Sequence, residues 1–128
     1  MKRIVVADDS QTARMFVKRC LQIVGLQDVE FCEAGNGKEA LALLKEQPTD
    51  LLVTDLNMPT MDGETLLKWV KGNPRLTDVP VMVVTSAGNP AKEEQLVKLG
   101  AFCVLNKPVN PALLREKLQP LLKEISDA

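Results

Sequence analysis

The stretch Leu51–Gly63 reads LLVTDLNMPTMDG, and it decides the fold. Its first three residues form an apolar run too short for a helix, with Pro48 upstream and Pro59 downstream. This pattern is typical of a buried strand that leads into a loop. Asp55 stands where the strand ends, and a carboxylate is costly to bury. A lone aspartate there is ordinarily a turn or cap residue, so the ends of the other strands decide its interpretation.

The composition indicates one soluble globular domain. The chain has 128 residues, of which 45% are hydrophobic and 26% are charged, and no stretch resembles a linker. We therefore expect a single domain over residues 1–128 without an output domain. A net charge of −1 argues against a nucleic-acid partner, which would need a basic face. No apolar run has membrane-spanning length and no signal peptide is visible, so we expect a cytoplasmic protein.

The chain contains no histidine. This excludes Ser-His-Asp and Cys-His catalysis and imidazole metal sites, and it leaves carboxylates, hydroxyls, lysine or a hard metal ion to carry any chemistry. The three cysteines are widely spaced without a CxxC motif, so they are interpreted as reduced thiols of a cytosolic protein.

Apolar runs and amphipathic segments alternate along the whole chain. Strands are expected at residues 4–7, 29–34, 51–54, 79–85 and 102–105, and helices at 13–24, 38–46, 64–71, 90–99 and from about 110 onward. Five such βα units with short connections predict an α/β fold, a single doubly wound domain with a five-stranded parallel sheet and five helices.

Two helices carry more detailed expectations. One face of the first helix is expected to be buried, comprising Ala13, Phe16, Val17, Cys20, Leu21 and Val24. The last helix is expected to bury Leu114, Leu118, Leu121, Leu122 and Ile125. Pro120 lies inside that second pattern, which predicts a kink or a break.

Polar side chains stand at the carboxyl ends of four predicted strands. In a parallel sheet these ends share one edge, where ligands bind. The residues are Asp8 and Asp9 after the first strand, Asp55 after the third, Thr85 at the end of the fourth and Lys107 after the fifth. Each has a structural explanation by itself; an acidic pair, for example, favours a helix N-terminus. Their joint placement is a strong signal, because chance would have to supply it four times.

This set of groups favours a hard cation and an anion. Three close carboxylates repel one another, so either a pKa rises or a cation binds. Oxygen ligands without cysteine or histidine suit Mg²⁺ and disfavour zinc. Lys107 can pair with the carboxylates or with an added anion, to which Thr85 can donate a hydrogen bond. The set suits phosphoryl transfer onto a carboxylate, with Asp55 as the nucleophile.

At this point the sequence resembles the receiver domains of two-component response regulators, of the stand-alone CheY-like type. The resemblance covers the whole chain and rests on DDS after the first strand, TDLNMPTMDG around the third, VVTS at the fourth and NKP at the fifth. It implies a flavodoxin-like strand order of 2-1-3-4-5. It also implies a phosphohistidine donor on a sensor histidine kinase or a histidine phosphotransfer protein, and a downstream target protein. A signalling phosphoacceptor, not an enzyme with its own substrate, and a monomer are expected.

The resemblance also assigns roles. Asp55 matches the phosphoacceptor, Asp9 a direct Mg²⁺ ligand, Asp8 a ligand acting largely through water, and Asn57 the residue whose backbone carbonyl completes the metal site.

Thr85 matches the switch hydroxyl, and Lys107 matches the lysine that pairs with the phosphoryl group, with a cis bond to Pro108. The chain departs from the family at Val104, where an aromatic residue often takes part in switching. Output through the fourth helix, fifth strand and fifth helix is therefore a hypothesis supported by Thr85 alone.

Two other functions remain open from the sequence. A phosphatase of the haloacid-dehalogenase type also uses an aspartate nucleophile and Mg²⁺, but no substrate-cap insertion is visible. An interaction module with a vestigial acidic site is the second, and the complete set of residues argues against it. A nucleotide-binding fold is weaker still, because neither GxGxxG nor a Walker lysine motif occurs.

Overall fold

The computed structural model describes residues 1–86 and 88–127, and the side chains as far as residue 122. Strands and helices alternate through ten elements. The strands are β1 (Arg3–Ala7), β2 (Glu30–Ala34), β3 (Leu51–Thr54), β4 (Val81–Thr85) and β5 (Cys103–Asn106). The helices are α1 (Gln11–Val24), α2 (Gly37–Glu46), α3 (Gly63–Gly72), α4 (Pro90–Lys98) and α5 (Pro111–Asp127). The predicted α/β fold class is confirmed.

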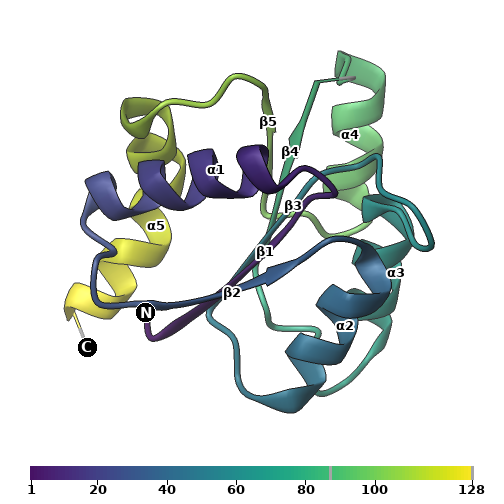
Figure 1. Ribbon diagram of the computed structural model, residues 1–128, viewed down its shortest axis with the longest axis horizontal. Coiled ribbons are helices and arrows are strands. Elements are labelled where there is room, and N and C mark those ends of the chain that lie inside the picture. The colour runs from purple at the N-terminus through teal and green to yellow at the C-terminus, as the bar shows by residue number, and fades with distance from the viewer. Residues whose placement is uncertain (87, 128) are drawn as a thin grey trace.

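All strand pairs are parallel, and the sheet has the order β2-β1-β3-β4-β5 that the resemblance implied. Figure 1 shows α1 and α5 together on one side of the sheet and α2 and α3 on the other. Alternate residues of β1 serve the two cores: Ile4 and Val6 pack beneath α1 and α5, and Val5 and Ala7 pack beneath α2 and α3. The central strands are buried on both faces, which explains their continuous apolar runs.

The end of α1 at Val24 was correctly anticipated, its start lies two residues earlier than expected, and its buried face was anticipated only in part. The Ser10 hydroxyl accepts a hydrogen bond from the Ala13 amide (3.2 Å) at the start, and Gly25 ends the helix with φ = 121°. Val17 packs in the core, whereas Phe16 is 49% exposed, so the prediction that Phe16 faces the core is wrong. Neighbouring helical residues point about 100° apart, and the face that meets the sheet is narrower than the apolar pattern.

A kink or a break was expected in α5, and a break does not occur, since the helix continues through Pro120. Proline removes one backbone donor and leaves the carbonyl of Glu116, four residues earlier, without its helical partner. Both residues are exposed, so water can satisfy that carbonyl. Leu114 and Leu118 are fully buried as expected. Leu121 and Leu122 are partly buried, and the side chain of Ile125, like residue Ala87, lies outside the described residues.

A charged residue that the sequence did not single out joins α2 to the sheet. Arg3 on β1 is only 4% exposed, and its Nη1 donates to the carbonyls of Leu43 (2.8 Å) and Gln47 (3.0 Å) and to Oγ1 of Thr49 (2.9 Å). The guanidinium therefore satisfies carbonyls at the end of α2 and places its charge at the negative end of the helix dipole.

Candidate functional site

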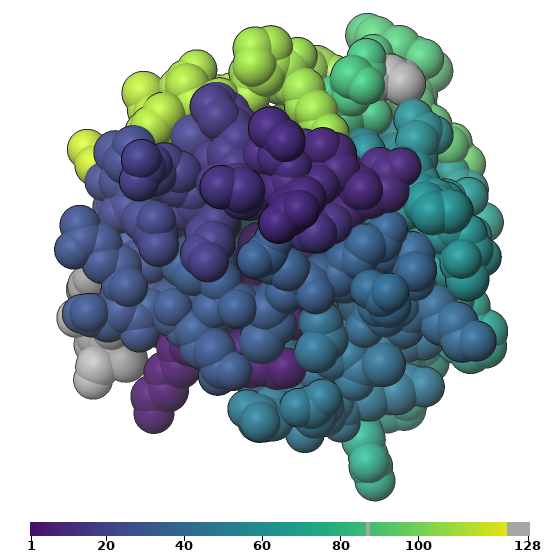
Figure 2. Space-filling view, in the orientation of Figure 1, coloured from purple at the N-terminus to yellow at the C-terminus, as the bar shows by residue number. Residues whose placement is uncertain are grey.

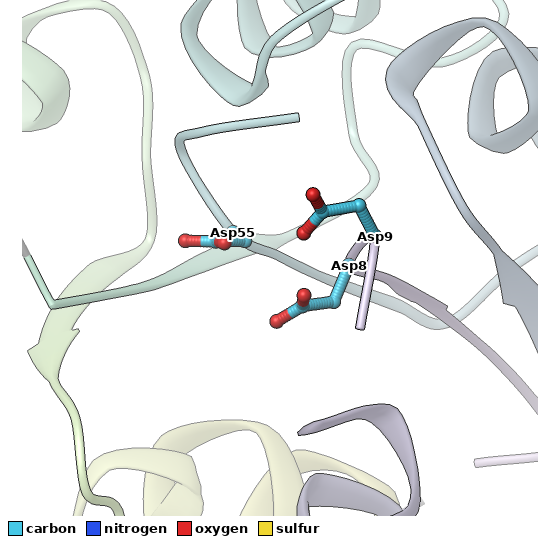
Figure 3. Close-up of side chains that lie close together, drawn as sticks. All are labelled: Asp8, Asp9 and Asp55. Atoms are coloured by element: carbon cyan, nitrogen blue, oxygen red, sulfur yellow. The ribbon is translucent and has the colours of Figure 1, made fainter. Parts of the chain in front are cut away.

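Three carboxylates converge at the carboxyl edge of the sheet. Asp8 and Asp9 follow β1, and Asp55 follows β3, the neighbouring strand. One oxygen of each carboxylate lies within 4.8 Å of the others. Figure 3 shows the three side chains gathered in one space, with Asp8 and Asp9 entering it from the same turn. Asp8 and Asp55 are buried and Asp9 is exposed, so the cluster is open to solvent on one side.

Lys107 neutralises part of this charge. Its Nζ donates to Oδ2 of Asp8 at 2.9 Å and lies 3.6 Å from Oδ2 of Asp55, although 99 residues separate Lys107 from Asp8. The Lys107 side chain is 27% exposed, so its charge is partly shielded from water. The peptide bond to Pro108 is cis, as the resemblance implied.

The two charged partners have shifted pKa values. Burial raises the pKa of Asp55, and the charge of Lys107 and the backbone amides of Leu56 and Asn57 only partly offset this effect. For Lys107, burial alone would lower the pKa, but the hydrogen bond to Asp8 and the charge of Asp55 outweigh it and raise the pKa. The cluster thus holds a carboxylate whose ionised form is unfavourable in the absence of a further cation.

Close backbone packing fixes the loop after Asp55. The Gly63 amide donates to the Leu56 carbonyl (2.8 Å), and the Gly37 amide donates to the Met61 carbonyl (2.9 Å). A Cβ at Gly63 would lie 2.0 Å from the Asp55 carbonyl oxygen, and one at Gly37 would lie 2.6 Å from the Met61 carbonyl oxygen. Glycine is therefore required at both positions, and the loop is held from both ends.

The structure brings the other predicted residues to the same edge. Asn57 is exposed two residues after Asp55, and its backbone amide interacts with the Asp55 carboxylate. Thr85 is fully buried at the end of β4, where its carbonyl accepts from the Lys107 amide (2.9 Å). All six residues that the sequence singled out thus belong to one region of the molecule.

Two supporting residues were missed. Arg14 of α1 donates to the Asp8 carbonyl (2.6 Å) and to Glu33 (3.0 Å), so it fixes the acidic turn to α1 and β2. Asn106 precedes Lys107 and donates to Glu93 of α4 (3.2 Å). The position of Arg14 on the first turns of α1 was a usable signal, whereas the contact between β5 and α4 could not be inferred from spacing.

An apolar groove of about 520 Å³ borders the cluster between α1 and the segment after β5. Ser10, Ala13, Phe16, Val17, Val84, Lys107, Pro108 and Val109 are among its lining residues. Figure 2 shows α1, in indigo, lying against the segment after β5, in lime, along the upper side of the molecule. The exposed Phe16 that the helical pattern misplaced therefore lies at the rim of this groove.

The fold and the site together define a class. A doubly wound parallel sheet with an aspartate cluster and a lysine at its carboxyl edge is the architecture of phosphate-handling α/β domains that use a carboxylate acceptor and a hard cation. Residues 4–119 match the family model of the response regulator receiver domain, and the chain belongs to that family. It is a phospho-accepting response regulator of two-component signalling, and the hydrolase and vestigial-module alternatives are not favoured.

Relatives and solved structures agree with this assignment. A chemotaxis protein CheY homolog of Campylobacter jejuni is 38% identical over 121 residues, covering 94% of this chain and 92% of the relative. Chemotaxis protein CheY1 of Helicobacter pylori is 36% identical, covering 94% of this chain and 96% of the relative. The structure of Vibrio cholerae chemotaxis protein CheY4 superposes with a TM-score of 0.81 at 32% identity, covering 94% of this chain and 98% of that one.

Within the described part of the chain, none of the helices has the length and apolar character needed to cross a membrane.

The raised pKa of Asp55 predicts that Asp55→Asn stabilises the protein in the absence of divalent cations. At pH 7 the carboxylate is ionised, and its ionised form costs more in the folded than in the unfolded chain. We expect a gain on the order of 1 kcal/mol in the free energy of unfolding, the usual scale for one substitution. The gain should shrink as the pH falls through the raised pKa of Asp55 toward its ordinary value of 3.8, because the folded wild type then takes up a proton first. Urea titrations between pH 7 and pH 4 measure it.

Asp28→Asn, which removes one charge at an exposed position, serves as the control and should show no such trend. A variant Asp55→Asn that is less stable than the wild type at pH 7 would contradict the assignment of Asp55 as an electrostatically unfavourable carboxylate.

Proposed function

We propose that Asp55 is the phosphoacceptor of this response regulator. One observation carries the proposal. The Asp55 carboxylate lies close to the carboxylates of Asp8 and Asp9 and to the ammonium group of Lys107, which also contacts Asp8. Such a site can hold a cation and an anion together, which is the requirement for transferring a phosphoryl group onto a carboxylate.

The donor set fits Mg²⁺. Asp8, Asp9 and Asp55 each offer a carboxylate oxygen, and the described part of the chain places no histidine or cysteine among them. We assign these three side chains and the backbone carbonyl of Asn57 as the residues that would hold the ion. When bound, Mg²⁺ would neutralise carboxylate charge and offset the negative charge of a phosphoryl group.

In the transfer, an Asp55 carboxylate oxygen attacks the phosphorus of a phosphohistidine on a histidine kinase or a histidine phosphotransfer protein. A P–O bond forms as the P–N bond breaks, and the electron pair of the P–N bond returns to the imidazole nitrogen of the donor. Lys107 is close enough to exchange part of its pairing with Asp55 for the new phosphoryl oxygens. Attack of water on the phosphorus of the acyl phosphate reverses the modification and releases inorganic phosphate.

The groove beside α1 is proposed as the docking site of the donor. It adjoins Lys107, and its lining is largely apolar. Met15, Phe16 and Ile23 extend the exposed apolar surface along α1, at 59%, 49% and 57% exposure. A helix carrying the phosphohistidine can pack against this stripe and bring its phosphoryl group over Asp55.

For output we propose a path from Thr85 to α4 through Asn106. A Cβ at Gly88 would lie 2.6 Å from Oδ1 of Asn106 and 3.1 Å from Cγ2 of Thr85, so these groups are packed together. Asn106 in turn bonds to Glu93 on α4. A displacement of Thr85 toward a phosphoryl group can therefore reach α4, although Val104 supplies no aromatic side chain to the switch.

Phosphorylation by a small donor tests the acceptor. After incubation with acetyl phosphate, intact-mass spectrometry should show one added phosphoryl group on the wild type with Mg²⁺, and none without Mg²⁺ or on Asp55→Asn. Lys107→Met should also lose the modification or reduce it at least tenfold, because the developing charge loses its ammonium partner. An equal adduct on Asp55→Asn would overturn the assignment.

Phe16→Ala tests donor docking separately from chemistry. We expect the rate of transfer from a phosphorylated histidine kinase that accepts the wild type to fall about tenfold, since the substitution removes apolar contact area. Labelling by acetyl phosphate should stay within twofold of the wild type. Val97→Ala, which removes an exposed apolar side chain from α4, is the matched control. Equal losses with both donors would show that Phe16 acts on the site itself.

Nuclear magnetic resonance tests the output path. Phosphorylation with acetyl phosphate and Mg²⁺ should shift amide resonances of α4 and β5 in the wild type. Asn106→Val should reduce the α4 shifts by at least half and leave those around Asp55 in place, because it removes the bond to Glu93. Shifts confined to the loop after Asp55 in the wild type would refute the path.

A further inference from the structure

A second groove lies on the other face of the molecule, between α2 and α3. It has a volume of about 600 Å³, and it is lined by Leu41, Lys45, Thr65, Lys68, Trp69, Gly72, Asn73 and Pro74. Trp69 is the only tryptophan of the chain and is 57% exposed. Tryptophan is enriched at the energetic centres of protein interfaces because its large side chain supplies much apolar contact area, so an exposed tryptophan marks a candidate binding surface.

This groove is separate from the phosphoacceptor site. Its lining includes Lys45, the penultimate residue of α2, and residues 72–74 at the end of α3. Helices of a parallel α/β domain run opposite to the strands, so these helix ends lie toward the amino edge of the sheet. Asp8, Asp55 and Lys107 lie at the carboxyl edge. An occupant of the groove therefore leaves the acidic cluster accessible.

The charged residues that line the groove have one sign. Among the residues that the structure describes, Lys45 and Lys68 are the only charged ones in the lining, and none of the lining residues carries a carboxylate. Lys68 is paired with Glu64 at 3.4 Å, but it is 55% exposed, and no ion pair of Lys45 occurs among the described residues. The chain as a whole has a net charge of −1, so this is a local positive surface on a slightly acidic protein. An acidic occupant is favoured.

The two helices that border the groove are long enough to support a helical occupant. Figure 1 shows α2 and α3 side by side, and each has ten residues, or roughly 15 Å of helix. A third helix of about three turns can lie between them, with apolar side chains at i, i+3 or i+4 and i+7. Leu41, Trp69 and Pro74 offer apolar surface, and a Cβ added at Gly72 would meet nothing within 4 Å, which leaves open space at the end of the groove.

We propose that the α2–α3 groove docks an acidic amphipathic helix of a partner protein, with Trp69 as the apolar anchor and Lys45 and Lys68 as the charge contacts. The groove binds whether or not Asp55 is phosphorylated. It thereby holds the response regulator near a partner while the acidic cluster and the α1 groove stay open to the phosphodonor.

The test uses two fluorescein-labelled synthetic helical peptides of about 14 residues, roughly 21 Å long. Both carry leucines at i, i+3, i+4 and i+7; one carries glutamate and the other lysine at the remaining positions. Fluorescence anisotropy measures their affinities for the full chain, and unlabelled peptides report on the single tryptophan. We expect the acidic peptide to bind at least tenfold more tightly than the basic one and to shift the Trp69 emission to the blue.

Variants assign the binding to the groove. Trp69→Ala should weaken the acidic peptide at least tenfold, the scale of an interface anchor, and the double variant Lys45→Glu, Lys68→Glu should reverse the preference between peptides. Lys98→Glu, which reverses an exposed charge on α4, should have an effect below twofold. Urea unfolding verifies that the variants fold.

Asp55→Asn and acetyl-phosphate-treated wild type should bind the acidic peptide equally, so failure of the phosphoacceptor assignment would leave this result untouched. Equal binding of both peptides, or no binding at millimolar concentration, overturns the proposal. A concentration-dependent dimer in sedimentation velocity that Trp69→Ala abolishes would also overturn it, because the occupant would then be a second copy of the chain.

Discussion

The contact of the Lys107 ammonium with Asp8 and Asp55 is the interaction on which the site depends. Without it, no cationic side chain of the described residues would pair with the carboxylates at the edge of the sheet, and burial of Asp55 would be still more costly. The contact also joins residues 99 positions apart, because β5 lies at one end of the sheet and β1 lies one strand from the other end. A lysine in this position stabilises the ionised carboxylates and is already placed to meet an added anion.

The parallel sheet brings these polar side chains together with few requirements on the sequence. Each strand ends at the same edge, so one polar residue after each strand suffices to assemble the site. The apolar interiors of the strands, such as Val5 and Leu52, can then vary with packing alone, whereas the loop residues are constrained by close contacts. Gly63 shows the difference: its missing side chain lets α3 begin against the backbone of Asp55, and any Cβ would push the loop out of place.

Sequence patterns anticipated the elements, the parallel sheet and the placement of the singled-out polar residues at its carboxyl edge, because these depend on local periodicity and on strand ends. The order of the strands came from the family resemblance. The patterns failed where the burial or exposure of a residue depends on how much of its surface a neighbouring element covers. Phe16 has the spacing of a core residue, yet the sheet covers only the part of α1 that carries Val17. Pro120 has the chemistry of a helix breaker, yet its exposed position lets α5 continue. Nothing in the sequence pattern singled out Arg3, and only its packing against α2 shows it to be a buried cap.

The two surfaces outside the acidic cluster differ in a way that suits different tasks. The groove at Phe16 shares Lys107 with the acidic cluster, so a molecule bound in this groove lies beside the cluster. That molecule must dissociate before a second molecule can bind in the same groove. The groove at Trp69 shares no residue with the cluster, so occupancy there imposes no such exclusion. Under the two proposals, a phosphodonor at the Phe16 groove and a partner at the Trp69 groove can be bound at the same time. The opposite faces of a doubly wound sheet separate the two grooves, because α1 lies on one and α3 on the other.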